Sequence, residues 1–210
     1  MTYNFEYFSK LPLIKELDLI IKGTGEKLEG NCLYQHLSNF NYHRDNKEDL
    51  RRNIFSLCQN KKNILEVGFN GGHSVALYTY SNPNITIKSF DICSHTYTEK
   101  CADYIRESTD FNLELIKGDS QETLKTYNSN EKFDIIHIDG GHGYNPAKSD
   151  LHECKKFAHK DTLLIFDDSY AEMISKLLEE ELKNELIKEV NYKSLNLITT
   201  KYHRIFYYNL

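Results

Sequence analysis

The sequence predicts an α/β protein built on a doubly wound, mostly parallel sheet. Three observations favour this class. From about residue 60 onward, short apolar runs alternate with helical patterns, a glycine-rich turn follows the first run, and acidic residues end several later runs. Strands that alternate with helices form open sheets with helices on both faces. Ligands in such sheets bind beyond the carboxyl ends of the strands, so we expect the informative residues there.

The elements follow one another in a regular order after an irregular N-terminal part. Residues 1–40 show no sustained pattern apart from a short helix expected over 11–21, whereas apolar residues at helical spacing predict a helix over 47–58. The expected strands are 63–67, 86–91, 112–117, 133–138, 162–167, 186–192 and 203–208. The expected helices are 74–80, 97–108, 120–127, 146–158 and 170–183.

Composition limits the functional classes. A chain of 210 residues fits one domain with a full core. No apolar run approaches the roughly 18 residues of a membrane span, so no membrane partner is expected. The net charge of −5, with both signs interspersed, argues against a nucleic-acid partner. Five cysteines without a C-x-x-C pair are typical of reduced thiols, and we expect a cytoplasmic protein.

The first strand ends in an acidic residue, a glycine-rich turn and the start of a helix. Glycines let the backbone approach a ligand closely, and a helix start offers unpaired N–H groups. The spacing differs from the dinucleotide fingerprint G-x-G-x-x-G, because Asn70 stands between glycines at 68, 71 and 72. The turn therefore predicts a nucleotide-type pocket. Its candidate residues are Glu66, Gly68, Asn70, Gly72 and Ser74.

The second and third strands also end in polar residues. Asp91 ends the second strand, where an acidic side chain accepts hydrogen bonds from a ribose diol in both NAD and SAM (S-adenosylmethionine) pockets. Asp119 and Ser120 follow the third strand. An alternative role for Asp119 is the N-cap of helix 120–127.

The fourth and fifth strands end in a concentration of carboxylates. Asp139 follows the fourth strand, and Asp167 and Asp168 follow the fifth. Carboxylates gathered at one rim raise one another's pKa unless a cation joins them, and oxygen ligands suit Mg²⁺ or a similar ion. His142 lies close enough on the same loop to remove a proton from a hydroxyl. Alternatively, the paired aspartates cap the next helix and His142 only orients a ligand, while His137 is expected to be a packed core histidine.

These motifs together resemble the class I SAM-dependent O-methyltransferases, and among them the metal-dependent sugar and macrolide enzymes. The resemblance rests on E-x-G-x-x-x-G-x-S from Glu66 to Ser74, on Ile138-Asp139-Gly140-Gly141-His142 and on Phe166-Asp167-Asp168. It covers about residues 45 to 208. It implies a Rossmann-like sheet of seven strands, mostly parallel, with an antiparallel last strand.

The resemblance also implies roles for the candidate residues. The glycine loop would wrap the amino-acid end of SAM, Asp91 would bind the ribose, and Asp119 and Ser120 would contact the adenine. Asp139, which we also count among the cofactor residues, would be a catalytic residue and a metal ligand.

The rest of the implied site lies after the fourth and fifth strands. His142 would be the general base, and Asp167 and Asp168 would complete a site for Mg²⁺ or Mn²⁺. Catechol O-methyltransferases are more distant, because they carry Lys at the position of His142 and Asn at the second position of the fifth-strand pair. The Asn/Asp-Pro-Pro-Tyr signature of N-methyltransferases is absent.

The sequence thus predicts a metal-assisted O-methyltransferase acting on a hydroxyl of a small molecule, with a sugar or polyol as the expected acceptor. Residues 1–45 are expected to form a lid that shapes the substrate pocket, and residues 46–210 the methyltransferase domain. The aromatic last strand suggests a homodimer. The alternatives are a SAM-binding protein without catalysis, a catechol or phenol O-methyltransferase, and a nicotinamide-dependent oxidoreductase.

Overall fold

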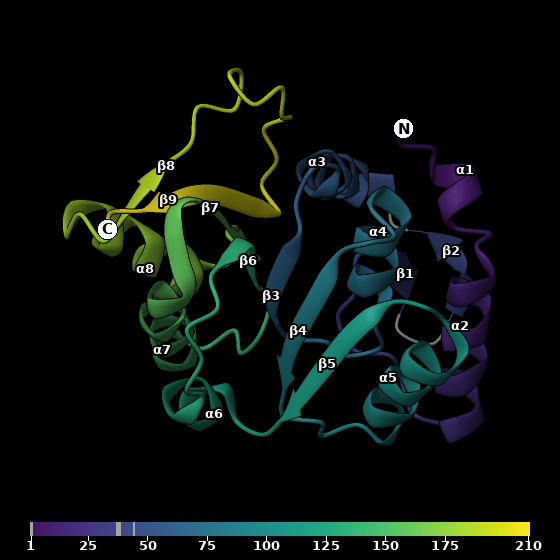
Figure 1. Cartoon of the computed structure of the whole chain (residues 1–210). Helices are drawn as coiled ribbons and strands as arrows, with labels where there is room; N and C mark the ends of the chain where they lie inside the picture. The colour runs from purple at the N-terminus through teal and green to yellow at the C-terminus, as the bar shows by residue number, and fades with distance from the viewer. Residues whose placement is uncertain (1, 37–38, 44) are drawn as a thin grey trace.

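The computed structural model describes residues 2–36, 39–43 and 45–210, and it is organised around a seven-stranded sheet of order β5-β4-β3-β6-β7-β9-β8 (Figure 1). The strands are β3 Asn63–Val67, β4 Thr86–Asp91, β5 Asn112–Lys117, β6 Phe133–Ile138, β7 Ala158–Asp167, β8 Ile187–Glu189 and β9 His203–Tyr208. β3 to β7 pair in parallel, and β9 runs antiparallel to both β7 and β8. The expected α/β class and the antiparallel last strand are confirmed.

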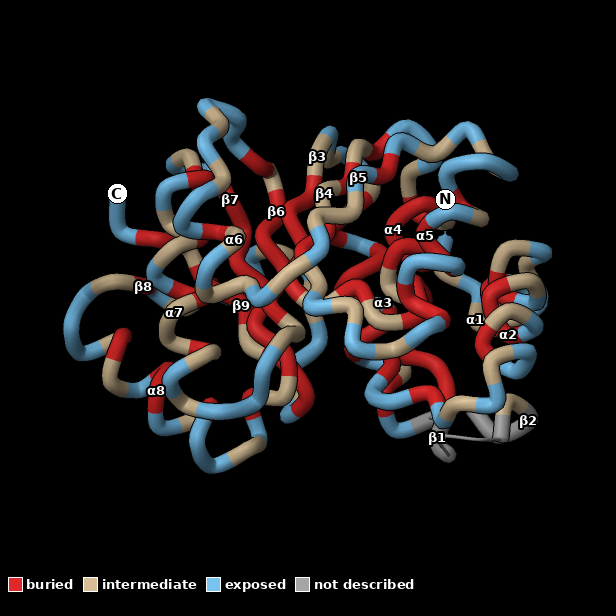
Figure 2. Tube along the Cα trace, turned by 90° about the horizontal axis from the view of Figure 1, so that it is seen from below, coloured by how far each residue is buried: buried red, intermediate tan, exposed pale blue. Residues whose placement is uncertain are grey.

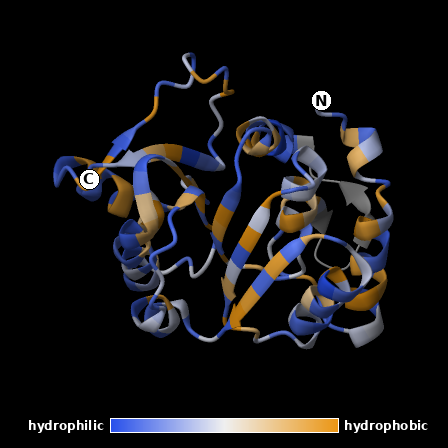
Figure 3. Ribbon diagram, in the orientation of Figure 1, coloured by the Kyte–Doolittle hydropathy of each residue, from blue (hydrophilic) through white to orange (hydrophobic). Residues whose placement is uncertain are grey.

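Helices cover both faces of the sheet and bury two apolar cores (Figure 2). One core includes residues of α2 Pro12–Thr24, α3 Glu48–Cys58, α4 His73–Ser81 and α5 Thr96–Ser108. The other includes residues of α6 Ser120–Thr126, α7 Tyr144–Cys154 and α8 Glu172–Lys183. Successive strand residues point to opposite faces, so Ile64 enters the first core and Leu65 the second. Apolar residues occur on both faces of the central strands, with polar residues between them (Figure 3).

The N-terminal part is more ordered than we expected. The helix expected over 11–21 is present as α2 and runs to Thr24, where Gly25 at φ +74° ends it. The expectation of otherwise irregular structure is wrong, because a short helix α1 (Phe5–Phe8) and a hairpin of β1 (Tyr34–His36) and β2 (Asn39–His43) are also present. Strands of three and five residues offer too few alternating positions for a pattern to stand out.

Several boundaries also differ from expectation. The helix expected over 146–158 ends at Cys154 and continues as a 3₁₀ turn, and β7 begins at Ala158, four residues before the apolar run that marked it. β8 has three residues where 186–192 was expected, because it is an edge strand that pairs with β9 alone. In the described ranges, no helix combines the length and the apolar character needed to cross a membrane.

Candidate active site

A cavity of about 640 Å³ opens at the carboxyl ends of the five parallel strands β3 to β7. Ten of the residues expected at the site line it: Gly68, Asn70, Ser74, Asp91, Asp119, Ser120, Asp139, His142, Asp167 and Asp168. Two expected residues, Glu66 and Gly72, lie outside the lining. The sheet therefore gathers residues from five separate strand ends around one space of the size that holds a nucleoside cofactor.

The glycine loop packs directly on the end of β6. Gly68 has φ +101°, and a Cβ added there would lie 2.1 Å from the carbonyl oxygen of Asp139. Its N–H donates to the carbonyl of Phe90 at 2.8 Å, while the N–H of Asp139 donates to Val67 at 2.8 Å. Only glycine fits this position, because both the backbone angle and the close approach exclude a side chain.

Glu66 lies behind the loop and supports it. The carboxylate is fully buried and accepts hydrogen bonds from the hydroxyls of Ser74, Tyr78 and Ser89. Burial raises the pKa of Glu66, and the hydroxyl donors oppose that shift. With its oxygens engaged, Glu66 organises the loop from beneath, and direct contact with a cofactor remains a prediction.

Asp91 joins the second strand end to the glycine loop. The N–H of Asn70 donates to its Oδ2 at 2.8 Å, and the N–H of Cys93 donates to its Oδ1 at 2.7 Å. Asn70 and Cys93 both have positive φ, which aims these N–H groups at the carboxylate. Each carboxylate oxygen keeps a further lone pair, so Asp91 can still accept hydrogen bonds from a ribose diol.

The side chain of Asn70 holds an N-terminal segment by hydrogen bonds at the end of the cavity beside the glycine loop. We call residues 26–31 the latch segment. Asn70 Nδ2 donates to the carbonyls of Glu29 and Gly30, and the hydroxyl of Tyr97 donates to Asn70 Oδ1 at 2.7 Å. His95 stacks on Tyr97 and lies 3.0 Å from Glu26 and 3.5 Å from Glu29. Glu29 to Cys32 line the cavity, so the latch segment is part of its wall.

Asp119 is the N-cap of α6 and also lines the cavity, while its contact with an adenine stays a prediction. Its carboxylate caps α6 by accepting from the N–H of Gln121 at 2.9 Å. The neighbouring Ser120 lowers the pKa of the buried Asp150 behind it, but burial is stronger and raises that pKa to about 6. The cap fixes the position of Asp119 at the cavity wall.

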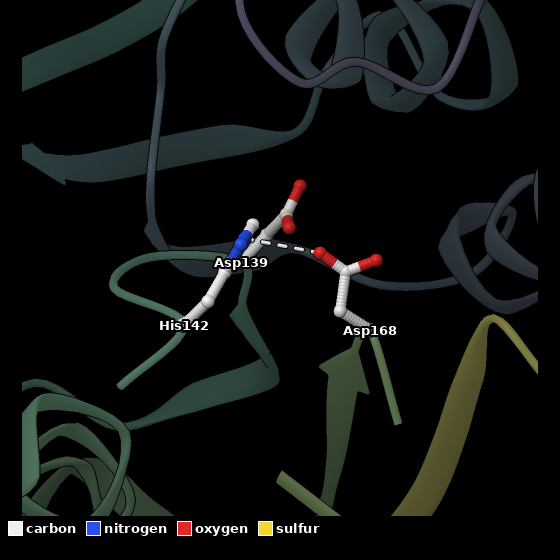
Figure 4. A group of neighbouring side chains, drawn as sticks. All are labelled: Asp139, His142 and Asp168. Carbon is white, nitrogen blue, oxygen red and sulfur yellow. Dashed lines mark ion pairs between the residues drawn. The ribbon is translucent and has the colours of Figure 1, made fainter. Parts of the chain in front are cut away.

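The fourth and fifth strand ends bring Asp139, His142 and Asp168 together (Figure 4). One ligand atom from each lies within 4.8 Å of the others, and His142 Nε2 is 3.0 Å from Asp168 Oδ2. Asp168 has φ +52°, a left-handed conformation that aspartate tolerates. Burial, with Asp167 nearby, raises the pKa of Asp139 to about 8. Contact with Asp168 raises the pKa of His142.

Asp167 lies outside this cluster, although the sequence grouped it with Asp168. It is buried beside His137 and His203, with its Oδ1 at 3.2 Å from His137 Nε2 and 3.8 Å from His203 Nδ1. Burial opposes ionisation, but His137 and Lys47 hold the pKa of Asp167 below its usual value. His137 is buried within the sheet, as expected of a core histidine, and also reaches the cavity lining.

Sequence reasoning missed Lys47 and the latch contacts. Lys47 lines the cavity with a buried side chain, 5.8 Å from the ring of Tyr202, and its charge favours ionisation of Asp139 and Asp167. It stands in a polar run before a helix, which is typical of a solvated lysine. No local signal separates it from its exposed neighbours.

The strand order and the antiparallel last strand are those of class I SAM-dependent methyltransferases. A family model described as a methyltransferase domain matches residues 65–169, which is half of the chain. The chain therefore belongs to this methyltransferase family, and the predicted enzyme class is confirmed.

Solved structures of similar fold cover nearly the whole chain. An O-methyltransferase from Bacillus cereus in complex with SAH (S-adenosylhomocysteine) is 15% identical, with a TM-score of 0.66 over 94% of this chain and 90% of that chain. A Streptomyces achromogenes O-methyltransferase of tomaymycin synthesis, in complex with SAM, is 14% identical, with a TM-score of 0.61 over 95% and 92%.

An SAH-bound methyltransferase from Podospora anserina is 13% identical, with a TM-score of 0.67 over 98% of this chain and 93% of that chain. At these identities the likeness shows the fold alone. No curated protein is significantly similar to the chain in sequence.

Proposed function

We propose that this protein is an O-methyltransferase that uses SAM and transfers its methyl group to a hydroxyl of a sugar or polyol. One observation carries the proposal. A single cavity joins the glycine loop and Asp91, which suit a nucleoside with an amino-acid tail, to the cluster of Asp139, His142 and Asp168, which suits an oxygen nucleophile.

The cluster fits a divalent cation such as Mg²⁺ or Mn²⁺. Asp139 is a partly buried carboxylate, and desolvation together with the charge of Asp167 raises its pKa, so a cation beside it would favour its ionised form. Asp139 and Asp168 would hold the ion as oxygen ligands, with Asp167 as a further oxygen donor set back in the wall. A bound cation would supply Lewis acidity, which lowers the pKa of a hydroxyl that contacts it.

The side chains of the protein supply the proton transfer and the orientation. His142 would accept the proton of the acceptor hydroxyl, and Asp168 would stabilise the resulting imidazolium, as its effect on the pKa of His142 indicates. The glycine loop would hold the sulfonium methyl opposite that hydroxyl for an in-line displacement.

We call the end of the cavity beside Asp168 the acceptor end, and an aromatic side chain lines it. Tyr170 is half exposed, lines the cavity beside Asp168 and makes an edge contact with Tyr202, with ring centroids 5.6 Å apart. Such rings stack on the apolar face of a sugar while the hydroxyls reach polar groups. We propose the cytoplasm as the location, and a homodimer that light scattering would test.

Calorimetry with SAH, with NAD as the control ligand, tests the cofactor class. We expect micromolar binding of SAH and no heat from NAD. Methyl-labelled SAM is then supplied with a panel of sugars, polyols and catechol, with and without Mg²⁺.

Asp139→Ala and His142→Ala should keep SAH binding and lose methyl transfer. Turnover in either variant would refute the catalytic roles. Preferential methylation of catechol would show that the acceptor is a catechol and not a sugar or polyol. SAH binding without turnover of any acceptor would favour a non-catalytic binding protein.

A further inference from the structure

The acceptor end of the cavity rests on a buried row of side chains from three neighbouring strands. β6 contributes His137, β7 contributes Asp167 and β9 contributes His203, and all three are buried. Asp167 and His203 stand directly opposite each other in the antiparallel register of β7 and β9. Three buried atoms have no well-aligned hydrogen bond, so the contacts among them are electrostatic: His137 Nε2, Asp167 Oδ1 and His203 Nδ1.

Asn53 determines which nitrogen of His203 carries the proton. The N–H of Ile198 donates to Asn53 Oδ1 at 2.8 Å, and Asn53 Nδ2 donates to the carbonyl of Ile198 at 2.7 Å, which fixes the orientation of the amide. Its remaining hydrogen points to His203 Nε2 at 3.0 Å. Because an amide nitrogen only donates, Nε2 must be the acceptor. The proton of the neutral ring is thus assigned to Nδ1, which faces Asp167 Oδ1.

His137 approaches the same oxygen from the other side. The hydroxyl of Tyr78 donates its one proton to Glu66 Oε1 at 2.9 Å, so the contact between Tyr78 and His137 uses a proton on His137 Nδ1. For Nε2 of that ring to attract Asp167 Oδ1 at 3.2 Å it must carry a proton as well, so His137 acts here as an imidazolium. Both imidazoles converge on Oδ1, which leaves Oδ2 for the cavity that Asp167 lines.

We propose that His203, held as its Nδ1–H tautomer by Asn53, is a positioning residue that acts with His137 to fix the Asp167 carboxylate with Oδ2 turned to the acceptor end. The use of this carboxylate rests on the proposed function, in which its free oxygen receives the acceptor hydroxyl or a cation. Carboxylates held by a second group keep one orientation, which a precise site requires. Through Ile198, the same contacts tie the segment between β8 and β9 to α3.

Nitrogen NMR of the full chain labelled with ¹⁵N-histidine tests the proposal without any substrate. We expect His203, identified by its loss in His203→Asn, to show a protonated Nδ1 and a bare Nε2. Its Nδ1–H signal should shift or be lost in Asp167→Asn and stay unchanged in Asp168→Asn, the matched control one residue away. In Asn53→Asp the new carboxylate should draw the proton to Nε2. A protonated Nε2 in the wild type, or equal responses to the two aspartate variants, would overturn the proposal.

If Asn53→Asp does not fold, two variants of His203 test the proposal instead. His203→Asn keeps an amide N–H near the position of Nδ1, whereas His203→Leu removes it. The ¹³C carboxylate resonance of Asp167 should match the wild type in the first variant and shift in the second, and identical spectra would refute the positioning role. SAH affinity should stay within about threefold of the wild type in both variants, because His203 is not part of the cavity lining. Absence of SAH binding in the wild type would defeat the proposed function alone.

Discussion

Single residues at the strand ends determine the local geometry of the site. Gly68 combines φ +101° with a Cβ position 2.1 Å from the carbonyl of Asp139, so we expect Gly68→Ala to destabilise the protein by about 2 kcal/mol or more and to abolish SAH binding. Gly23→Ala is the matched control, because no atom lies within 4 Å of that Cβ and its φ is not positive. Urea unfolding and calorimetry measure both effects. Normal SAH binding by Gly68→Ala would contradict the close packing of the loop on β6.

We expect Asp150 to make the stability of the protein depend on pH. Burial raises the pKa of Asp150 from 3.8 to about 6, so the folded state holds its proton more tightly than the unfolded state. The stability this provides is fully present below pH 3.8 and is lost as the pH rises through about 6. Full loss corresponds to about 3 kcal/mol at 1.36 kcal/mol per pKa unit.

Asp150→Asn should remove this dependence. The stability of the variant relative to the wild type should therefore rise by up to about 3 kcal/mol between pH 4 and pH 7. Urea unfolding at both pH values, with Asp134→Asn as the control at a less buried aspartate, measures the difference. Parallel pH profiles for the Asp150 variant and the wild type would exclude Asp150 as the source.

Among the elements, the latch segment depends on one side chain of the glycine loop. Asn70→Gly keeps a residue that tolerates φ +52° but removes the side-chain contacts to Glu29, Gly30 and Tyr97. At roughly 1 kcal/mol for each net hydrogen bond, we expect SAH to dissociate on the order of tenfold or more faster. Backbone amides of residues 26–31 should also exchange hydrogen faster.

The control for this prediction is Asn196→Gly. Asn196 has φ +53° and is exposed, so the backbone effect of the substitution is the same while the latch segment is left intact. Stopped-flow release of SAH and hydrogen exchange followed by mass spectrometry compare the two variants. Equal changes in both would show that backbone freedom, and not the latch contacts, accounts for the effect.

At the scale of the whole molecule, the sequence predicts the sheet better than the polar contacts within the site. Apolar runs marked the seven strands, most clearly β3, β6, β7 and β9, whose residues are largely buried. The topology then brought Asp91, Asp139 and Asp168 to one rim. The different surroundings of Asp167 and Asp168 could not be predicted. Adjacent in sequence, they separate because Asp168 turns out of the strand at φ +52° while Asp167 stays paired with His203.

Which residues of the N-terminal part reach the cavity could not be predicted either. Lys47 and the latch segment reach the cavity through packing of α2 and α3 against α4 and α5, which no local pattern records. Such contacts join parts of the chain that lie far apart in sequence. A lid function for residues 1–45 therefore remains a proposal, supported by the position of residues 29–32 in the cavity wall.

Because segments from the N-terminal latch to β7 meet around one cavity, a cofactor bound there should stabilise the whole molecule. A ligand at 100 times its dissociation constant that binds only the folded state stabilises it by about 2.7 kcal/mol. For a chain of this length, that corresponds to a rise in Tm of about 5 to 10 °C. Thermal unfolding with increasing SAH should show this rise, whereas NAD should leave Tm unchanged. Asn70→Gly should show a smaller rise at the same SAH concentration, since weaker binding lowers the ratio of ligand to dissociation constant. A Tm independent of SAH in the wild type would mean that the cavity does not hold this cofactor.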